Sequence, residues 1–533
     1  MTSLDQHELT TRSARSTKAQ STKTQSTKAQ WWILVIIACA QLMVVLDSTI
    51  MIIALPSAQK ALGFSDTERQ WVITGYTLAF GGFLLLGGRI SDMLGPRRTL
   101  MVGVIGFALA SALGGAAPDT VVLIAARGLQ GLCGALLAPS VLSLLSATFT
   151  NPRERARAFG IYATIAIGGS AFGLILGGLL TQYADWRWCL YVNLPIAALV
   201  IFGIVTMIPK STGRSGVRLD VAGVVLGCGG LVALVYGLGE AGADGWGSRG
   251  VLVPLAIAVA LLAGFVVWQS RGPNPLLPLR VLRDRNRSGA YLTILLAMTA
   301  MFGTFVSLTY LFQSVDGYSP LRSGIAFLPL MLLNGLASTQ LASRLMPHVP
   351  TRLLIVPGLL AASVGVALLT RLTPESAFAT HVLPTEILLG VGLGVAMVPV
   401  ISTATSNADP GDVGVISAMS TTSQQIGASI GTALLNTIAA SAATSYLASH
   451  RGGDAVHATV HGYATTSAWA AGILALAALV AGLLINVHPG RAHATQPAGS
   501  QGGAPAAQPS REALLVPAAR SEQTAATEHR SEA

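Results

Sequence analysis

The sequence predicts an all-α integral membrane protein with fourteen transmembrane helices. Of its 533 residues, 52% are hydrophobic and only 11% are charged, whereas a soluble domain has about 25% charged residues. Apolar runs of roughly 20 residues, the length that crosses a bilayer as a helix, recur along the chain. An internal repeat further predicts that two sets of six helices correspond to each other.

The apolar runs define the predicted helices and domains. The runs are 31–53, 71–91, 98–117, 120–146, 157–181, 188–208, 219–238, 250–268, 289–312, 322–343, 352–370, 381–403, 413–440 and 463–487. We expect a six-helix bundle at 31–208, a linker with two extra helices at 209–288, and a second six-helix bundle at 289–487. Residues 1–30 and 488–533 are polar and are predicted to be disordered tails.

The repeat appears as matching residues on one offset. Four residues recur 258 positions later, namely Pro152, Glu154, Gly169 and Gly173, as Pro410, Asp412, Gly427 and Gly431. Many secondary transporters consist of two repeated halves, with the substrate site between them near the membrane midplane. The repeat therefore favours a transporter, in which helices 7 and 8 are an insertion between the halves.

The distribution of basic residues predicts the orientation. The formal net charge is +10, but the basic residues lie mostly in short loops, so no nucleic-acid partner is expected. Lys and Arg are concentrated in the N-terminal tail and in the loops that follow even-numbered helices. Cytoplasmic loops of membrane proteins carry this excess. We therefore expect a multi-pass protein of the inner (plasma) membrane with both termini in the cytoplasm.

Helices 2 and 3 are joined by a short charged turn. Gly95 and Pro96 mark a tight turn between two apolar runs, at a membrane surface where water can solvate the charges. We predict a conformational latch in which Asp92 binds arginines or helix N-termini on the cytoplasmic side when the protein faces outward. The predicted latch residues are Gly88, Asp92, Gly95, Arg97 and Arg98. An ordinary basic turn that anchors the chain is the alternative.

Three ionisable residues lie inside apolar runs: Asp47 in helix 1, Arg127 in helix 4 and Glu386 in helix 12. A charge in the bilayer costs about 2.5–3.5 kcal/mol, so each is a functional candidate. With about 1.5 Å of rise per residue, all three fall at a similar level on the outer side of the midplane. We predict a proton-coupling role, because burial and neighbouring cations change the proton affinity of a carboxyl group. The alternatives are a static Asp47–Arg127 ion pair and a Glu386 side chain that reaches an external vestibule.

Helix 5 carries a stripe of small residues. Gly169, Gly173 and Gly177 are spaced four apart, and Gly178 follows. Small residues on one helix face let two helices approach closely. Helix 13 repeats part of this stripe at Gly427 and Gly431, so we expect the two helices to pair between the halves. Plain helix packing is the alternative explanation.

Several other chemistries have no support in the sequence. No Gly-x4-Gly-Lys-Ser/Thr phosphate loop occurs, so ATP is not expected as the energy source. His457 and His461 have the spacing of metal ligands, but they are predicted to lie in an external loop without a third ligand. No catalytic cluster at a water interface is found. We therefore expect no metal, no cofactor and no enzymatic activity.

In combination, these motifs resemble one transporter family. The turn at Gly88–Arg98 is similar to the helix 2–3 loop of the major facilitator superfamily, although Met93 and Pro96 stand where basic residues are usual. The helix-1 run Leu46-Asp47-Ser48-Thr49-Ile50, Arg127 and the helix-5 glycines occur in the order of the 14-helix drug:proton antiporters. In the glycine motif, Leu174 occupies the place of a common proline. The resemblance covers about 31–487.

The resemblance implies a major facilitator fold and a role for Asp47 and Arg127 in proton coupling. It identifies Gly169, Gly173, Gly177 and Gly178 as the antiporter motif. The function that it implies is proton-driven efflux of an antibiotic or other amphipathic small molecule, which confers resistance and uses protons and the lipid bilayer as partners. A proton-coupled metabolite exporter or importer on the same fold is the nearest alternative. A membrane-embedded enzyme or a receptor belongs to a different class and lacks a supporting motif.

Overall fold

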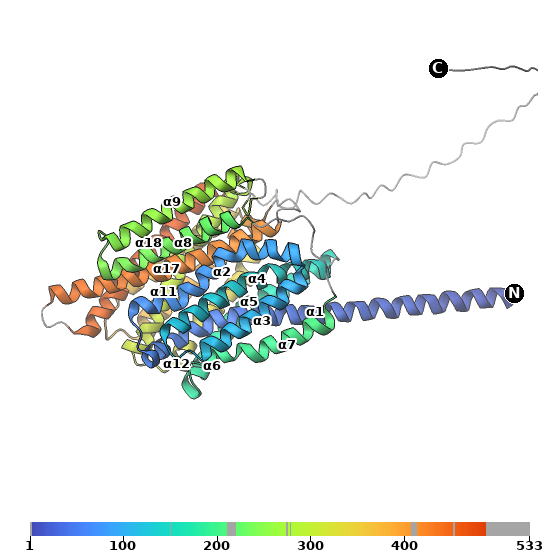
Figure 1. The fold of residues 1–533 in the computed structure, drawn as a ribbon, viewed down its shortest axis with the longest axis horizontal. Coiled ribbons are helices and arrows are strands. Elements are labelled where there is room, and N and C mark those ends of the chain that lie inside the picture. Colours follow the sequence, from blue (N-terminus) through green and yellow to red (C-terminus); the bar gives the residue numbers. More distant parts are fainter. Residues whose placement is uncertain are drawn as a thin grey trace, which may run out of the picture. The chain divides into compact units, whose positions relative to one another are not determined.

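The chain is almost entirely helical where the structure, a computed structural model, describes it. The described residues are 3–149, 151–209, 220–272, 275–277, 279–406, 413–450 and 454–486. Side chains are described from Ala29 onward, except at 66–67, 152–153, 156, 163, 166–167, 242–244 and 413–414. The predicted tail at 488–533 lies outside these residues. Figure 1 shows the helices running side by side in long antiparallel bundles.

The helices before the insertion are α1 Ser3–Leu62, α2 Asp66–Leu94, α3 Pro96–Gly115, α4 Thr120–Thr148, α5 Pro152–Tyr183, α6 Trp188–Tyr191 and α7 Asn193–Met207. The inserted helices are α8 Val221–Asp244 and α9 Arg249–Arg271, and the short α10 Arg280–Arg283 follows. We call α1–α7 the first half of the protein and α11–α18 the second half.

In the second half, several α-helices are continued or preceded by short π-helical or 3-10 segments, labelled η. Its elements are α11 Arg285–Tyr310, η1 Leu311–Val315, α12 Pro320–Ala326, α13 Leu328–Leu336, η2 Ala337–Ala342, α14 Ser343–Leu345, α15 Thr351–Leu368, η3 Leu369–Arg371, η4 Phe378–Val382, α16 Leu383–Thr405, α17 Val413–Ser449 and α18 Ala455–Leu484. The segments η1, η2 and η4 are π-helical turns.

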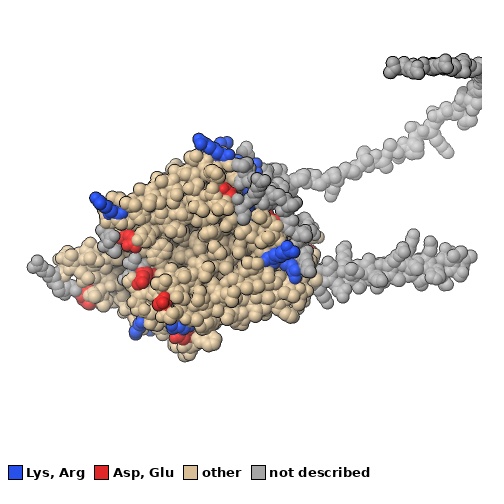
Figure 2. Space-filling view, viewed as in Figure 1, with Lys and Arg blue, Asp and Glu red and all other residues tan. Residues whose placement is uncertain are grey.

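The predicted spanning helices are present. Within the described residues, thirteen helices are long and apolar enough to cross a membrane. The 32-residue helix α5 coincides with the remaining predicted run. Figure 2 shows a band without charged residues between two ends where Lys, Arg, Asp and Glu gather, on the face in view. This is the surface expected of a chain that spans a bilayer many times.

Two expectations differ from the structure. The predicted disorder of residues 1–30 contrasts with a helix α1 that begins at Ser3. No Gly or Pro interrupts the sequence before Pro56, so the polar segment can continue the helix of the first span. The expected external loop at His457 and His461 is also wrong, because α18 begins at Ala455 behind the N-cap Asp454. Within the described residues no cluster of three possible metal ligands occurs.

The predicted pairing of α5 with α17 through their glycines is wrong. A Cβ on Gly173 would lie 2.1 Å from Thr49 Oγ1 of α1, so the α5 stripe packs within the first half. A Cβ on Gly431 would lie 2.1 Å from the Thr299 carbonyl oxygen of α11, so the α17 stripe packs within the second half. Gly173 and Gly431 therefore serve corresponding contacts, of α5 with α1 in the first half and of α17 with α11 in the second, as expected of a repeated sequence.

The inserted helix α8 lies against both halves. Its Cys228 Sγ would be 3.2 Å from a Cβ on Gly82 of α2. On the other side, Thr437 of α17 donates hydrogen bonds to the carbonyls of Leu238 (3.0 Å) and Gly239 (3.2 Å). Figure 1 shows α8 between α9 and α17. The partner helix α9 packs on α8 and presents exposed apolar side chains such as Val259.

Asp220 connects the start of α8 to the end of α9. Its carboxylate accepts hydrogen bonds from Gly223 N (2.8 Å), Trp268 Nε1 (2.8 Å) and Gln269 Nε2 (2.7 Å). Partial burial opposes ionisation, but these hydrogen bonds together hold the pKa of Asp220 below its usual value. The stabilisation is therefore complete above the unfolded pKa of about 3.9 and is lost only as the pH falls through the lower folded pKa.

We expect Gln269→Ala to release the linker after α9. The Gln269 side chain is buried and bridges Asp220 to Leu277 N (3.2 Å), so its loss removes two hydrogen bonds, worth about 1–3 kcal/mol together. Trypsin should cleave after Arg271 or Arg280 faster than in the wild type. Ser270→Ala is the control, because Ser270 is exposed and its hydroxyl donates to the Val267 carbonyl within α9. Equal cleavage of the two variants would contradict the tether.

Candidate functional site

Asp47 and Arg127 form a buried ion pair in the interior of the first half. Arg127 Nη1 lies 2.5 Å from Asp47 Oδ2, and both residues are at most 2% exposed. The residues come from α1 and α4, and their contact is the ion pair that the sequence left as an alternative. Arg127 Nε also donates to the Val72 carbonyl (3.2 Å), and its guanidinium lies 4.4 Å from the centre of the Tyr76 ring. Val72 and Tyr76 of α2 thus hold the Arg127 side chain in place in addition to the Asp47 carboxylate.

Polar side chains from α4 and α7 complete the shell around Asp47. Gln130 Nε2 and Asn193 Nδ2 each donate to Asp47 Oδ1 at 2.9 Å. Gln130 Oε1 accepts from Arg127 (2.8 Å), and Ser111 Oγ of α3 accepts from Gln130 Nε2 (2.8 Å). Both carboxylate oxygens of Asp47 are therefore bonded. A buried carboxylate with a cation and two amide donors is stable in its charged form.

Sequence analysis missed the role of Gln130, Ser111 and Asn193. One signal was available, because Gln130 and Asn193 are amide side chains inside apolar runs. Such residues seldom face lipid and usually find polar partners between helices. Their partner could not be chosen from sequence, since Asn193 is 146 positions from Asp47.

Glu386 lies in the second half and does not join the Asp47–Arg127 pair. It is in the first turn of α16 and is fully buried. Neither of its carboxyl oxygens makes a hydrogen bond of good geometry among the described residues, although the backbone of Leu330 on α13 lies close to it. A Cβ on Gly390, one turn later, would lie 2.6 Å from the Leu330 carbonyl oxygen, so this face of α16 packs on α13. The alternative of a Glu386 side chain that reaches an external vestibule therefore does not hold in this conformation.

The turn between α2 and α3 has the expected form. Gly95 has a φ of +87°, which favours glycine, and it ends α2 just before Pro96 begins α3. Arg97 donates to the Ile204 carbonyl (3.3 Å) near the end of α7. Asp92 and Arg98 are exposed, and Asp92 has no ion pair within the described residues. The latch thus stays a prediction for another conformation.

Two residues next to the predicted latch have contacts that sequence analysis did not anticipate. A Cβ on Gly88 would meet Pro139 of α4 at an ordinary contact distance of 3.9 Å, whereas a Cβ on Gly87 would lie 2.0 Å from the Ala135 carbonyl oxygen of α4. Arg89 donates to the Pro275 carbonyl (2.8 Å) in the linker that follows α9. The turn is therefore connected to the inserted helices.

The two halves meet closely at one set of helix ends. Tyr310 Oη of α11 donates to Gln59 Oε1 of α1 (2.6 Å), and Gln313 Nε2 donates to the Ile53 carbonyl (3.0 Å). Gly178 of α5 and Gly324 of α12 also lie close to the other half, because a Cβ there would lie 2.6 Å from Leu321 Cα and 2.3 Å from the Leu174 carbonyl oxygen, respectively. The predicted topology puts these ends outside the cell, and we call them the outer ends.

Sequence comparison identifies a family and named relatives. The sequence model of the Major Facilitator Superfamily matches residues 37–432. The puromycin resistance protein pur8 of Streptomyces alboniger is 49% identical over 90% of this chain and 95% of its own. The cephamycin export protein CmcT of Amycolatopsis lactamdurans is 37% identical over 78% of this chain and 87% of its own. The tetracenomycin C resistance and export protein of Streptomyces glaucescens is 36% identical over 77% and 76%.

Solved structures share the fold at low sequence identity. The POT family transporter PepTSo matches with a TM-score of 0.61 and 16% identity, over 85% of this chain and 98% of that one. A bacterial homologue of the lysosomal transporter Spinster, in an inward-facing and unoccupied conformation, matches with a TM-score of 0.60 and 14% identity, over 86% and 97%. These matches concern the arrangement of helices alone.

Proposed function

Because the chain belongs to the Major Facilitator Superfamily, we propose that it is a proton-driven efflux transporter that exports an antibiotic or another amphipathic small molecule and confers resistance. Relatives named for antibiotic resistance and export cover most of the chain. The protein spans the membrane many times, and we place it in the cell membrane with both termini in the cytoplasm. A puromycin-like compound is the first substrate to test, because of the 49% identical relative.

One observation carries the proton-driven part of the proposal: Glu386 is a fully buried carboxyl group without a hydrogen bond of good geometry within the described residues. Burying a charged carboxylate without a partner is costly, so this environment favours the protonated form. A conformation in which water reaches Glu386 would release that proton. A difference in wetting between two conformations is what couples a proton to a transport cycle.

The Asp47–Arg127 pair has a different role in this conformation. Asp47 is held by Arg127, Gln130 and Asn193, so both of its carboxylate oxygens are occupied. The pair fixes α1 against α4 and α7, which is the static alternative raised by the sequence. It exchanges a proton only if the transport cycle separates the carboxylate from the arginine. Asp47, Arg127 and Glu386 thus remain the proposed coupling residues, with Glu386 as the proton carrier.

We expect Glu386→Gln to abolish proton-driven transport while leaving the fold intact. The amide has the size of a protonated carboxyl but cannot release a proton, so stability should change by about 1 kcal/mol or less. Everted vesicles energised by respiration should no longer accumulate a puromycin-like fluorescent compound. Exchange of the compound across the membrane without a gradient should continue. A membrane potential supplies about 2.3 kcal/mol per charge per 100 mV. The loss of one coupled proton per cycle should therefore lower the accumulation of the compound by a measurable amount.

Glu375→Gln is the matched control, because Glu375 is an exposed carboxylate in the segment just before η4. It should transport like the wild type. Protonophore-sensitive accumulation by Glu386→Gln at the wild-type rate would refute the assignment of Glu386 and turn attention to Asp47.

The alternatives on the same fold predict other directions or substrates. A proton-coupled importer would accumulate its solute in right-side-out vesicles rather than in everted ones. A metabolite exporter would not transport any of a panel of amphipathic antibiotics, but it would transport a metabolite of its host. Purified protein that moves no solute under any gradient would favour a receptor or enzyme instead.

A further inference from the structure

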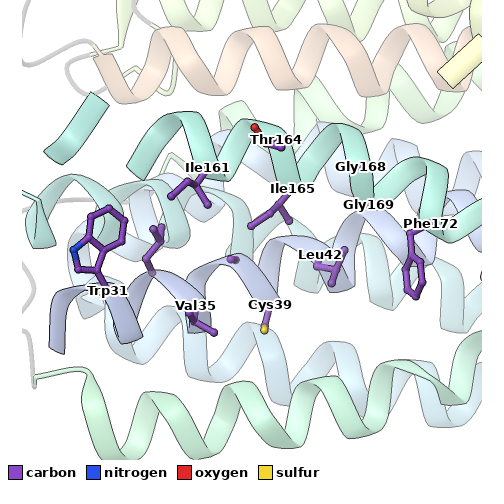
Figure 3. Close-up of a pocket in the computed structure, with 12 residues that line it drawn as sticks. Trp31, Val35, Cys39, Leu42, Ile161, Thr164, Ile165, Gly168, Gly169 and Phe172 are labelled. Atoms are coloured by element: carbon purple, nitrogen blue, oxygen red, sulfur yellow. The ribbon is translucent and has the colours of Figure 1, made fainter. Parts of the chain in front are cut away.

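An apolar groove lies between α1 and α5 in the part of the first half that is remote from the outer ends. Its volume is about 630 Å³. Figure 3 shows Val35, Cys39 and Leu42 of α1 on one wall, and Ile165, Gly168 and Phe172 of α5 on the other. Nearly all atoms that line it are apolar. The coupling network and Glu386 contribute no residue to it.

The groove opens away from the second half, between α5 and α7. Ile36 of α1 packs on Gly203 of α7, where a Cβ would lie 2.5 Å from the isoleucine side chain. On the opposite side of the contact between α1 and α5, Tyr162 Oη donates to Gln41 Oε1 (2.7 Å) and closes it. Val35 is 46% and Phe172 is 53% exposed, as side chains that meet lipid can be. The groove therefore faces the bilayer.

The length of the groove suits one lipid leaflet. Its α1 wall runs from Trp31 to Leu42, about 16 Å at 1.5 Å per residue. The hydrocarbon core of a bilayer is about 30 Å thick, so one leaflet is about 15 Å. Trp31 begins the apolar part of α1, at the depth where tryptophan marks the membrane interface. An acyl chain that enters beside Trp31 would reach the bilayer midplane at Leu42.

The mouth of the groove carries positive charge. The Arg157 guanidinium lies 5.1 Å from the centre of the Trp31 ring, and the Arg157 side chain is exposed. A lipid headgroup at this level would therefore meet the Arg157 cation while its chain fills apolar space.

We propose that the groove between α1 and α5 is a binding site for an anionic phospholipid of the leaflet in which α1 begins, the cytoplasmic leaflet under the predicted topology. One acyl chain occupies the groove, and the phosphate binds Arg157 beside Trp31. The acyl chain would lie between the faces of α1 and α5 beside Gly168 and Gly169, where small residues would otherwise let the two helices approach closely. A lipid at this position would influence the motion of α5 against α1.

Native mass spectrometry of the purified protein, titrated with phosphatidylglycerol or with phosphatidylcholine of equal chain length, tests the proposal. The wild type should retain one phosphatidylglycerol with a preference of about fivefold, the effect of one basic residue at an anionic surface. Arg157→Gln should remove the preference and keep the adduct. Gly168→Phe should remove the adduct, because nothing lies within 4 Å of a Cβ at Gly168 and the ring can fill the groove without a clash.

Two matched variants serve as controls. Arg271→Gln removes an exposed arginine at the end of the lipid-facing α9, and Val259→Phe enlarges a residue of α9 that is 69% exposed. Both should retain the lipid as the wild type does. Equal binding of the two lipids to the wild type, or an adduct that survives Gly168→Phe, would overturn the proposal. So would displacement of the adduct by a puromycin-like compound at one-to-one stoichiometry, which would make the groove a site for the transported molecule.

Discussion

Removing either partner of the Asp47–Arg127 pair alone should destabilise the protein more than removing both. Asp47→Ala leaves Arg127 charged and almost fully buried, and Arg127→Ala leaves Asp47 in the same position. An uncompensated buried charge costs about 3–5 kcal/mol, whereas the loss of a whole buried pair costs much less. We therefore expect each single variant to lose about 3–5 kcal/mol, and the double variant to recover part of this loss. Unfolding in mixed detergent measures the three values and the coupling energy between them.

The exposed pair of Asp185 and Arg187 provides the comparison. The two side chains are 3.8 Å apart and are half and one third exposed, so Asp185→Ala should cost at most about 1 kcal/mol. Additive single losses at Asp47 and Arg127 would show that the two residues do not stabilise each other in the membrane. The hydrogen bonds of Gln130 and Asn193 would then be the main support of this site.

Gly178→Leu should stop transport by excluding the conformation in which the outer ends meet. A Cβ at Gly178 would lie 2.6 Å from Leu321 Cα and 2.7 Å from the Pro320 carbonyl oxygen, and backbone atoms cannot move aside easily. Overpacking of this kind costs about 1–3 kcal/mol, which shifts a two-state equilibrium about 5–150-fold. The contact joins the two halves, so a conformation with separated outer ends relieves it without unfolding either half.

Labelling of a cysteine introduced at Gln313 with a membrane-impermeant maleimide measures this shift. Gln313 donates to the Ile53 carbonyl across the halves, so its position should become accessible from outside in Gly178→Leu. Gly472→Leu is the control, because Gly472 is exposed on α18 and nothing lies within 4 Å of its Cβ position. Unchanged labelling together with normal transport would mean that α5 and α12 move apart without opening the outer ends.

The sequence predicted the helices well because the bilayer imposes a simple rule on them. A run of roughly 20 apolar residues has to be a helix, since every backbone polar group must be satisfied within the segment. The contact between Asp47 and Arg127 was an alternative that the sequence already offered, because two opposite charges at one depth stabilise each other. Helix ends were less certain. Residues 455–462, where His457, Thr459 and His461 interrupt the apolar sequence, continue α18 beyond the run that defined it.

The parts of the site that sequence could not predict depend on which helices are neighbours. Asn193 binds Asp47 because the start of α7 lies beside α1. Glu386 lacks a hydrogen bond of good geometry because its face of α16 packs on the backbone of α13. The glycines of α5 showed that some helix approaches closely, but the spacing was compatible with α1 or α17. Only the arrangement of helices decides between them.

The position of α8 restricts the exchange of molecules between the bilayer and the space between the halves. Because α8 covers the line along which α2 meets α17, a lipid-soluble compound has no lateral passage on that side. Hydrogen bonds join α8 to Thr437 of α17, so α8 should travel with the second half and slide along α2. A compound that arrives dissolved in the membrane must then enter beside α5, where no inserted helix stands in the way.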